Sequence, residues 1–421
     1  MSREVLPARF GDYLLVARLA TGGMAEVFLA IEEPRLGGQR FVAIKRVRAD
    51  YADEAEFAEF FRTEGRVSLK VHHPNLPAAH RLDELGGRGY LVLEYLHGHL
   101  ALGILRAIVH EHRTLSVAAA TSIALDVARA LDHLHTLTDL DGAPLGVIHR
   151  DVSPHNVIVT SSGHAKLIDL GIARAALQTH HTETGVVKGK YAYMAPEQLG
   201  PAHQLDTRAD VFSLGVMIHE FLVGRPLFQG LSDLDTCERV RGQVVAHPAR
   251  VRPDVPRAIG DVVMVALERD PERRWASAAA MVEALEDAAA RAGVVPSPTG
   301  LWREALAIAG PAPLPLLRDG ALVWSDGPAR VRAATPLTTI ADRSEPVDAD
   351  LEAALDELPD AVVREPLDDA PTDDVPTPLI DSVPVPIDAP AVRDPALAYY
   401  LHVGGVPDAI GEEPRKPGAR R

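Results

Sequence analysis

The chain has 421 residues, 47% of them hydrophobic, and a formal net charge of −16 at pH 7. Length alone suggests two or three domains as a soft prior. The negative charge argues against a general nucleic-acid-binding protein, because binding to phosphates requires a basic surface. A single cysteine, Cys237, excludes an intramolecular disulfide framework and fits a reducing compartment.

Neither a signal peptide nor a membrane span is indicated. The first residues contain no apolar core of the kind that signal peptides have. No stretch of about 18 or more uninterrupted apolar residues occurs. The nearest candidate, 301–324, contains four charged residues: Arg303, Glu304, Arg318 and Asp319. We therefore expect a cytoplasmic protein.

The first strand-like pattern surrounds a turn of small residues, Leu19–Phe28, with the sequence LATGGMAEVF. Apolar residues on both sides of the turn predict two strands joined by a hairpin. Small residues in such a turn let backbone amides approach a phosphate closely. Taken alone, a Gly-Gly pair in a hairpin is more often only a turn.

The next predicted strand, 41–47, has a lysine inside an apolar run. Period-two alternation places Lys45 on the same face as Ala43 and Val47. A lysine on a buried face is costly unless an anion pairs with it. The alternative is an edge-strand lysine whose ammonium group reaches water.

Residues 53–70 are predicted to form a helix with an acid in its apolar stripe. Phenylalanines at 57, 60 and 61 mark that stripe, and Glu64 continues it. An acid in this position needs a cation, and Lys45 needs an anion. We therefore expect Glu64 and Lys45 to pair.

Two later segments place acids at the ends of short apolar strands. In the loop HRDVSPHN, Asn156 follows Asp151 by five positions, so a tight loop can direct both side chains to one site. Asp169 ends the next predicted strand, before a flexible glycine. A lone Asp-x-Gly is usually a turn, but its distance from the preceding loop favours a ligand for Mg²⁺, which prefers carboxylate and amide oxygens.

Beyond about residue 288 the alternation of strand-like and helix-like patterns ends. Residues 341–410 contain 17 Asp and Glu side chains against three Arg, and prolines recur through them. Such a segment buries too little apolar surface to offset the entropy of ordering. We expect a folded domain over 12–287 and a largely disordered, acidic, proline-rich tail over 288–421. A chain truncated after about residue 295 should then be soluble and active, unless apolar residues of 296–340 such as Trp302 dock on the domain.

Taken in order, the GG turn, VAIK, the helical glutamate, HRD with its asparagine, DLG and APE resemble the motifs of bacterial Hanks-type (eukaryotic-like) serine/threonine protein kinases. The resemblance covers roughly 12–287. It implies an α+β, two-lobed fold, with a small β-rich N-lobe over about 12–96 and a larger helical C-lobe over about 97–287. It also implies transfer of the γ-phosphoryl group of ATP, with Mg²⁺, to hydroxyl groups of proteins.

The resemblance assigns nucleotide-binding roles. The turn expected to cover the ATP phosphates comprises Ala20, Thr21, Gly22, Gly23, Met24 and Ala25. The side chains expected around the adenine ring are Val27, Ala43 and Ile158, and the backbone groups expected at its edge belong to Glu94 and Leu96. Lys45 would hold the α- and β-phosphates.

The resemblance also assigns catalytic and structural roles. Asp151 would accept the hydroxyl proton of the substrate, and Asn156 and Asp169 would hold Mg²⁺. Glu197 of the APE motif would pair with Arg274, and Asp210 would anchor the backbone of the HRD loop. Regulatory phosphorylation is expected at Thr182 or Thr184, where Arg150 would bind the phosphate.

Two departures from the family pattern concern the phosphates. Alanines stand at two of the three usual glycine positions, Ala20 and Ala25. Ser153 stands where the family usually has a lysine that contacts the γ-phosphate, and Lys190 stands where it has a threonine. We expect Lys190 to supply the missing cation.

Besides an active kinase, the sequence leaves two readings open. A pseudokinase scaffold is favoured by Ser153 and by the alanines in the turn, and it is opposed by the retained polar residues. A small-molecule phosphotransferase is disfavoured by the APE motif and by the long activation segment, which runs from Asp169 to Glu197. The expected partners are protein substrates and proteins that bind the acidic tail, without nucleic acid.

Overall fold

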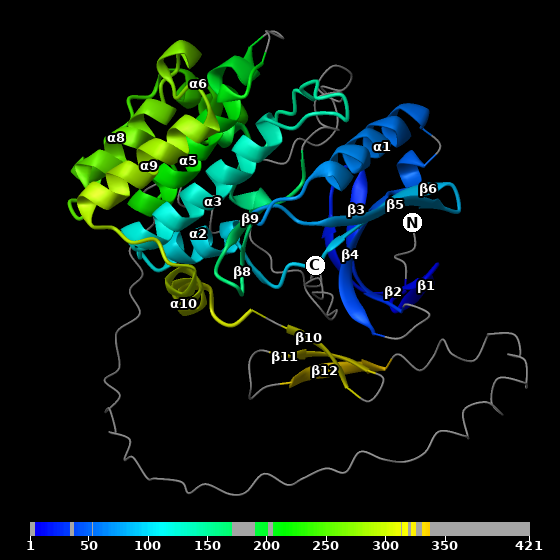
Figure 1. The fold of residues 1–421 in the computed structure, drawn as a ribbon. Helices are drawn as coiled ribbons and strands as arrows, with labels where there is room; N and C mark the ends of the chain where they lie inside the picture. The colour runs from blue at the N-terminus through cyan, green and yellow to red at the C-terminus, as the bar shows by residue number, and fades with distance from the viewer. Residues whose placement is uncertain are drawn as a thin grey trace, which may run out of the picture. The chain divides into compact units, whose positions relative to one another are not determined.

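A computed structural model describes residues 5–33, 38–52, 54–170, 190–200 and 205–312, and the backbone of three further strands between 314 and 336. These residues form a β-rich N-lobe and a helical C-lobe, drawn from blue to yellow in Figure 1. The two-lobed α+β fold expected from the sequence is confirmed.

The N-lobe is an antiparallel sheet of six strands in the order β1-β2-β3-β4-β6-β5. Its elements are β1 (Ala8–Phe10), β2 (Tyr13–Thr21), β3 (Ala25–Glu32), β4 (Arg40–Val47), the 3-10 turn η1 (Ala49–Tyr51), α1 (Ala55–Lys70), β5 (Ala79–Leu85) and β6 (Arg88–Glu94). Strands β3 and β4 pair without a register shift, and Val27 lies opposite Lys45. Alternation along β3 and β4 buries Phe28 and Ile44 in one apolar cluster.

The C-lobe combines a small sheet with a set of helices. Its strands β7 (Gly98–Leu100), β8 (Val157–Thr160) and β9 (Ala165–Leu167) are antiparallel. Its α-helices are α2 (Ala101–His110), α3 (Val117–His135), α5 (Arg208–Val223), α6 (Asp233–Gly242), α7 (Pro248–Val251), α8 (Arg257–Ala266), α9 (Ala278–Ala292) and α10 (Pro298–Ala309). Its 3-10 turns are η2 (Pro154–Asn156), η3 (Lys190–Tyr193), η4 (Pro196–Leu199) and η5 (Pro271–Arg273).

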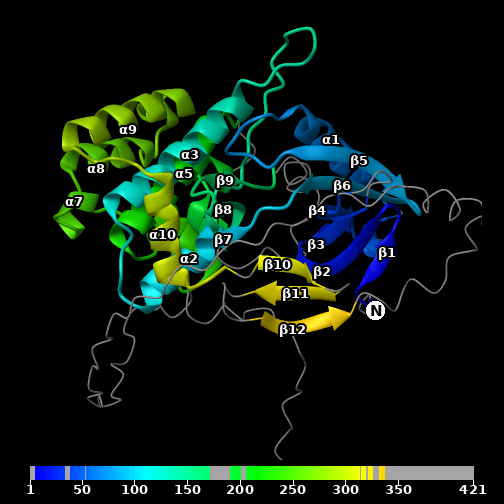
Figure 2. The ribbon, with the colours of Figure 1, turned by 60° about the horizontal axis from the view of Figure 1, so that its bottom comes forward.

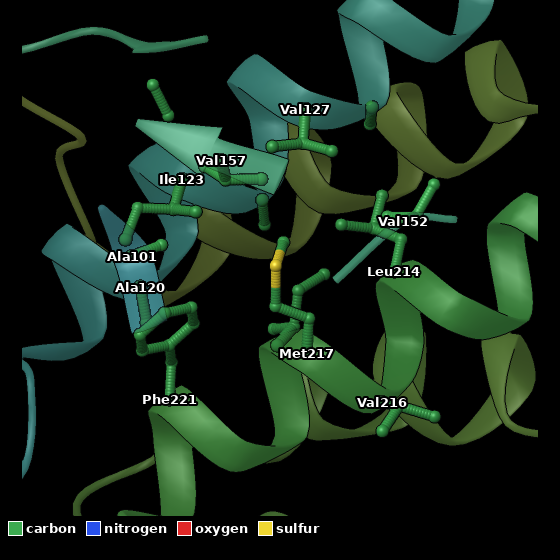
Figure 3. Close-up of a cluster of buried hydrophobic side chains, with 14 of the residues drawn as sticks. Ala101, Ala120, Ile123, Val127, Val152, Val157, Leu214, Val216, Met217 and Phe221 are labelled. Atoms are coloured by element: carbon green, nitrogen blue, oxygen red, sulfur yellow. The ribbon is translucent and has the colours of Figure 1, made fainter. Parts of the chain in front are cut away.

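Helix α5 forms the centre of the C-lobe. Every residue from Ala209 to Leu222 is buried, as expected for a helix that is apolar on most of its circumference. Figure 3 shows Met217 and Phe221 of α5 facing Ala120 and Ile123 of α3. The helix ends at Gly224, whose positive φ of 75° fits a left-handed cap. This packing holds α5 in a fixed position, and α5 carries Asp210, which binds the HRD loop.

The ordered C-lobe extends beyond the boundary expected at residue 287. Helix α9 continues to Ala292, and α10 packs against α2, α3 and β8 (Figure 2). Leu301, Ala305 and Ile308 of α10 are buried in the main apolar cluster. Their spacing of four and three residues is that of one helix face. The ordered structure continues past that boundary because Ser297 and Pro298 begin a helix here, with the Ser297 hydroxyl accepting a bond from the Gly300 amide at 3.1 Å.

A third sheet follows α10. Its strands β10 (Leu314–Arg318), β11 (Ala321–Ser325) and β12 (Val331–Pro336) pair antiparallel in that order. These strands also lie within the segment expected to be disordered. Residues 337–421 are outside the part of the chain that the structure describes. Among the helices it does describe, none has the length and apolar character needed to cross a membrane.

The packing of α10 reverses the expected result of truncation after residue 295. Such a chain loses α10 and exposes the apolar surface beneath it. A chain that ends after residue 312 keeps α10, so this surface stays covered. The burial of Leu301 and Ile308 stabilises the fold by about 3–6 kcal/mol. Thermal unfolding and gel filtration should show a lower melting temperature and aggregation for the shorter chain only. Equal melting temperatures would show that α10 adds no stability.

Candidate active site

The turn between β2 and β3 has the hairpin geometry expected for 20–27. The Gly22 amide donates to the Ala25 carbonyl at 2.8 Å, and the Arg48 amide donates to the Met24 carbonyl at 2.9 Å. A Cβ atom added at Gly23 would have no protein atom within 4 Å, and φ at Gly23 is not positive. The fold itself therefore does not require glycine at this position. The open space above the turn fits a ligand that approaches the backbone closely, such as a phosphate.

Lys45 lies at the centre of the polar network. Its ammonium nitrogen is 2.5 Å from Glu64 Oε1 and 2.9 Å from Asp169 Oδ1. The side chains of Lys45 and Glu64 are 13% and 8% exposed, so neither charge is screened by water. Burial alone would lower the pKa of Lys45, but the carboxylates of Asp169 and Glu64 together raise this pKa above its usual value. The predicted pairing of Lys45 with Glu64 is confirmed.

The HRD loop brings Asp151 and Asn156 together. The Asn156 amide nitrogen donates to the backbone carbonyl and to Oδ2 of Asp151, each at 2.8 Å. The amide of Ile168 donates to the Asn156 carbonyl at 2.8 Å, and the His149 ring lies 3.3 Å from the Ile168 carbonyl. Because Ile168 directly precedes Asp169, these bonds hold the loop and Asp169 in a fixed relation.

The backbone of this loop is held in an unfavourable conformation by a buried acid. Arg150 has φ of +63°, which is uncommon for a residue other than glycine. Its amide donates to Asp210 Oδ1 at 2.7 Å, and the His149 amide donates to Asp210 Oδ2 at 2.8 Å. His135 lies 2.8 Å from the same oxygen, and Asp210 is fully buried. Asp210 thus anchors the loop as predicted.

The second predicted ion pair is also present. The Arg274 guanidinium donates to Glu197 Oε1 at 2.6 Å and to Oε2 at 2.8 Å. The Arg274 side chain is fully buried, and it also donates to three backbone carbonyls, those of Glu268, Arg208 and Arg269. Removing one member of such a pair leaves an uncompensated buried charge. The pair therefore fixes the APE motif on the helical lobe.

The residues expected around adenine lie on three strands. Val27 is on β3, Ala43 on β4 and Ile158 on β8; Ala43 is buried and the other two are half-buried. At the end of β6, the Glu94 amide is bonded to the Ala78 carbonyl at 2.8 Å. The Leu96 amide has no backbone acceptor among the residues that the structure describes. A Leu96 amide that has no backbone acceptor in this part of the chain fits the expected contact with the adenine edge.

A second buried lysine was missed in the sequence. Lys166, on β9, lies 2.9 and 2.7 Å from the two carboxylate oxygens of Glu94. Its side chain is 15% exposed. Asn75 binds the same strand. Its side-chain amide donates to the Ala165 carbonyl, and its backbone carbonyl accepts from the Leu167 amide. The rule that identified Lys45, a lysine within a short apolar strand, applies equally to Lys166.

The structure describes Ser153 fully but only the backbone of Lys190, the two positions that differ from the family pattern near the γ-phosphate. Ser153 is buried, and its hydroxyl oxygen has no partner among the described side chains and backbone groups. Lys190 begins the 3-10 turn η3, but its side chain lies outside the description. Thr182 and Thr184 lie in 171–189, which is also outside it. The predicted role of Lys190 therefore stays a prediction.

The side chains present fit a magnesium ion that shares its ligands with phosphates. The side-chain nitrogen of Asn156 donates to Asp151, which leaves the side-chain oxygen Oδ1 of Asn156 as the metal ligand. Asp169 is 47% exposed and has φ of +59°. The described residues contain no cluster of three or more acidic, histidine or cysteine side chains suited to a metal. Mg²⁺ needs only one or two protein oxygens when phosphates and water complete its shell.

Comparison with known proteins agrees with this geometry. The protein kinase domain family matches residues 13–285. A tyrosine-protein kinase named MasK from Myxococcus xanthus is 38% identical over 277 residues, which are 66% of this chain and 43% of MasK. Serine/threonine-protein kinase PknA from Mycobacterium tuberculosis is 33% identical over 299 residues, 70% of this chain and 64% of PknA. The chain thus spans less than two thirds of the length of these relatives.

Solved structures show the same fold. The crystal structure of the Mycobacterium tuberculosis PknI kinase domain has a TM-score of 0.50 and 25% sequence identity, and the match covers 68% of this chain and all of that domain. The family match includes every residue of the network from Lys45 to Arg274 described above. The chain therefore belongs to the protein kinase family, and the curated serine/threonine kinases of bacteria are among its relatives.

Proposed function

We propose that the chain is an ATP- and Mg²⁺-dependent serine/threonine protein kinase that also phosphorylates its own activation segment. The observation that carries this proposal is the continuous polar network in which Glu64 binds Lys45 and Lys45 binds Asp169. The same network continues through Ile168 to Asn156 and Asp151. A scaffold that only binds partners has no need to keep a buried ammonium group at the cost of desolvation. This argues against the pseudokinase alternative.

Each member of the network has a role in phosphoryl transfer. Lys45 offers a desolvated positive charge to the α- and β-phosphates, and its fixed position means that little reorganisation is needed. Asp151 is held by Asn156 at 2.8 Å, so its carboxylate is oriented to accept the proton of a hydroxyl group. Mg²⁺, when bound through Asn156 and Asp169, would neutralise charge on the phosphates. Catalysis then depends on positioning and electrostatics.

Tyrosine is a second candidate acceptor. The MasK relative is named a tyrosine-protein kinase, and Ser153 replaces the lysine that serine/threonine kinases of the family usually have near the γ-phosphate. Ser153 is 2% exposed, so it offers no side chain to the surface where the acceptor hydroxyl must lie. The acceptor specificity therefore has to be measured on phosphorylated protein.

The first test removes the charge of Lys45. Lys45→Met keeps the aliphatic part of the side chain and removes the cation. We expect phosphoryl transfer to fall by about 100-fold or more, with the protein still folded. Lys70→Met, at the exposed end of α1, is the matched control and should keep full activity. A Lys45→Met protein with normal autophosphorylation and a normal melting temperature would contradict the nucleotide assignment.

The second test identifies the acceptor. The full-length chain and its Asp151→Asn variant are incubated with radiolabelled ATP and Mg²⁺, followed by phosphoamino-acid analysis and mass spectrometry. We expect phosphoserine or phosphothreonine, with phosphate on Thr182 or Thr184, and no label in the variant. Phosphotyrosine alone would support the second candidate. Absence of label in the unmodified chain, on itself and on added protein substrates, would support a scaffold.

The third test concerns the cation near the γ-phosphate. If Lys190 replaces the lysine absent at 153, Lys190→Thr should lower kcat at least about tenfold, while KM for ATP changes little. Adding Ser153→Lys to this variant restores the usual family pattern, so the double variant should regain activity. An unchanged kcat in Lys190→Thr would exclude the compensation.

A further inference from the structure

We define the nucleotide hinge as residues 94–97. Helix α10 contacts this hinge and the strand β7 that follows it. The family match ends at residue 285, and α10 begins at Pro298. Its contacts therefore lie outside the residues that the family model matches. Figure 2 shows α10 beside α2, close to β7.

Trp302 of α10 and Ala312 after it contact β7 and the hinge. The Trp302 ring lies with its centroid 5.5 Å from the His99 ring and 6.3 Å from the His97 ring. After the helix, the Ala312 carbonyl lies 3.2 Å from His97 Nε2. His97 directly follows Leu96, whose amide has no backbone acceptor in the described structure. Trp302 therefore packs against the side chains that directly follow the donor expected to meet adenine, beside the His97 carbonyl, which accepts from the Ser161 amide at 2.8 Å.

The rest of α10 is fixed to the helical lobe independently of the hinge. The Glu304 carboxylate accepts bonds from the Ser116 amide and hydroxyl at 2.5 and 2.7 Å. Ser116 caps α3, so this acid also meets the positive end of the α3 dipole. Arg113 donates to the Ala307 carbonyl at 3.1 Å. With its apolar face buried, α10 is a rigid support from which Trp302 projects.

We propose that Trp302 is a positioning residue for the nucleotide, because it fixes β7 and the hinge where the Leu96 amide can bind the adenine edge. This inference rests on the proposed nucleotide site. A loosened hinge costs affinity because a hydrogen-bond donor displaced by a fraction of an ångström no longer meets its acceptor with good geometry. The phosphate-binding network around Lys45 does not touch α10, so the chemical step should be preserved.

The test measures ADP binding to the full-length chain by calorimetry in the presence of Mg²⁺. Trp302→Ala should weaken ADP about fivefold, the affinity equivalent of one aromatic pair. Trp302→Phe keeps a ring against His99 and should restore most of the affinity. The matched control is Leu301→Ala, a substitution at the neighbouring buried residue of α10. This variant should be less stable but should keep the contact between Trp302 and the hinge.

Two further readouts separate positioning from a general loss of stability. KM for ATP should rise in Trp302→Ala while kcat stays within about twofold. Hydrogen exchange of residues 97–100 should increase in Trp302→Ala but not in Leu301→Ala. If both variants weaken ADP equally, or neither does, the positioning role of Trp302 is wrong. If the unmodified chain binds no ADP, the nucleotide site itself is wrong and this inference has no basis.

Discussion

A buried ammonium group has to be neutralised, and the position of Lys45 makes that requirement organise the active site. Its two partners come from different parts of the chain: Glu64 from α1 and Asp169 from the segment after β9. Moving Glu64 away leaves the buried ammonium group with only the half-exposed Asp169 as a partner, and moving Asp169 away removes one of its two counter-charges. The sheet, α1 and the segment around Asp169 are thus held in one arrangement. That arrangement is also the one in which the cation faces the place expected for phosphates.

The C-lobe solves the complementary problem of holding acids in fixed orientations. Asp210, which α5 carries into the interior, accepts two backbone amides of the HRD loop and stabilises the strained Arg150. Strain of this kind persists only where surrounding bonds determine the conformation. The result is a carboxylate at Asp151 whose position does not depend on the substrate. A site of fixed dipoles and charges is what phosphoryl transfer requires, since there is little covalent work for the protein to do.

Much of the site could be predicted because its polar residues are anomalous in their local patterns. Lys45 in an apolar strand and Glu64 in an apolar helical stripe each need a partner, and the structure pairs them. Lys166 follows the same rule, but its strand is only three residues long, too short for an alternating pattern to mark a buried face. Helix α10 was missed for a different reason. Proline and serine near 296–298 resemble the composition of a disordered tail, whereas position by position they are a cap and a first helical turn.

The hinge is contacted both from within the matched family domain and from the segment that follows it. On one side, Lys166 binds the Glu94 carboxylate and so ties the end of β6 to the strand that leads to Asp169. That contact lies within the family domain. On the other side, Trp302 and the Ala312 carbonyl reach His97 from outside it. In the hinge backbone, the Glu94 amide donates to the Ala78 carbonyl and the His97 carbonyl accepts from the Ser161 amide, each at 2.8 Å. The hinge is therefore held by bonds within the family domain, to which the segment after residue 297 adds contacts with the His97 and His99 rings.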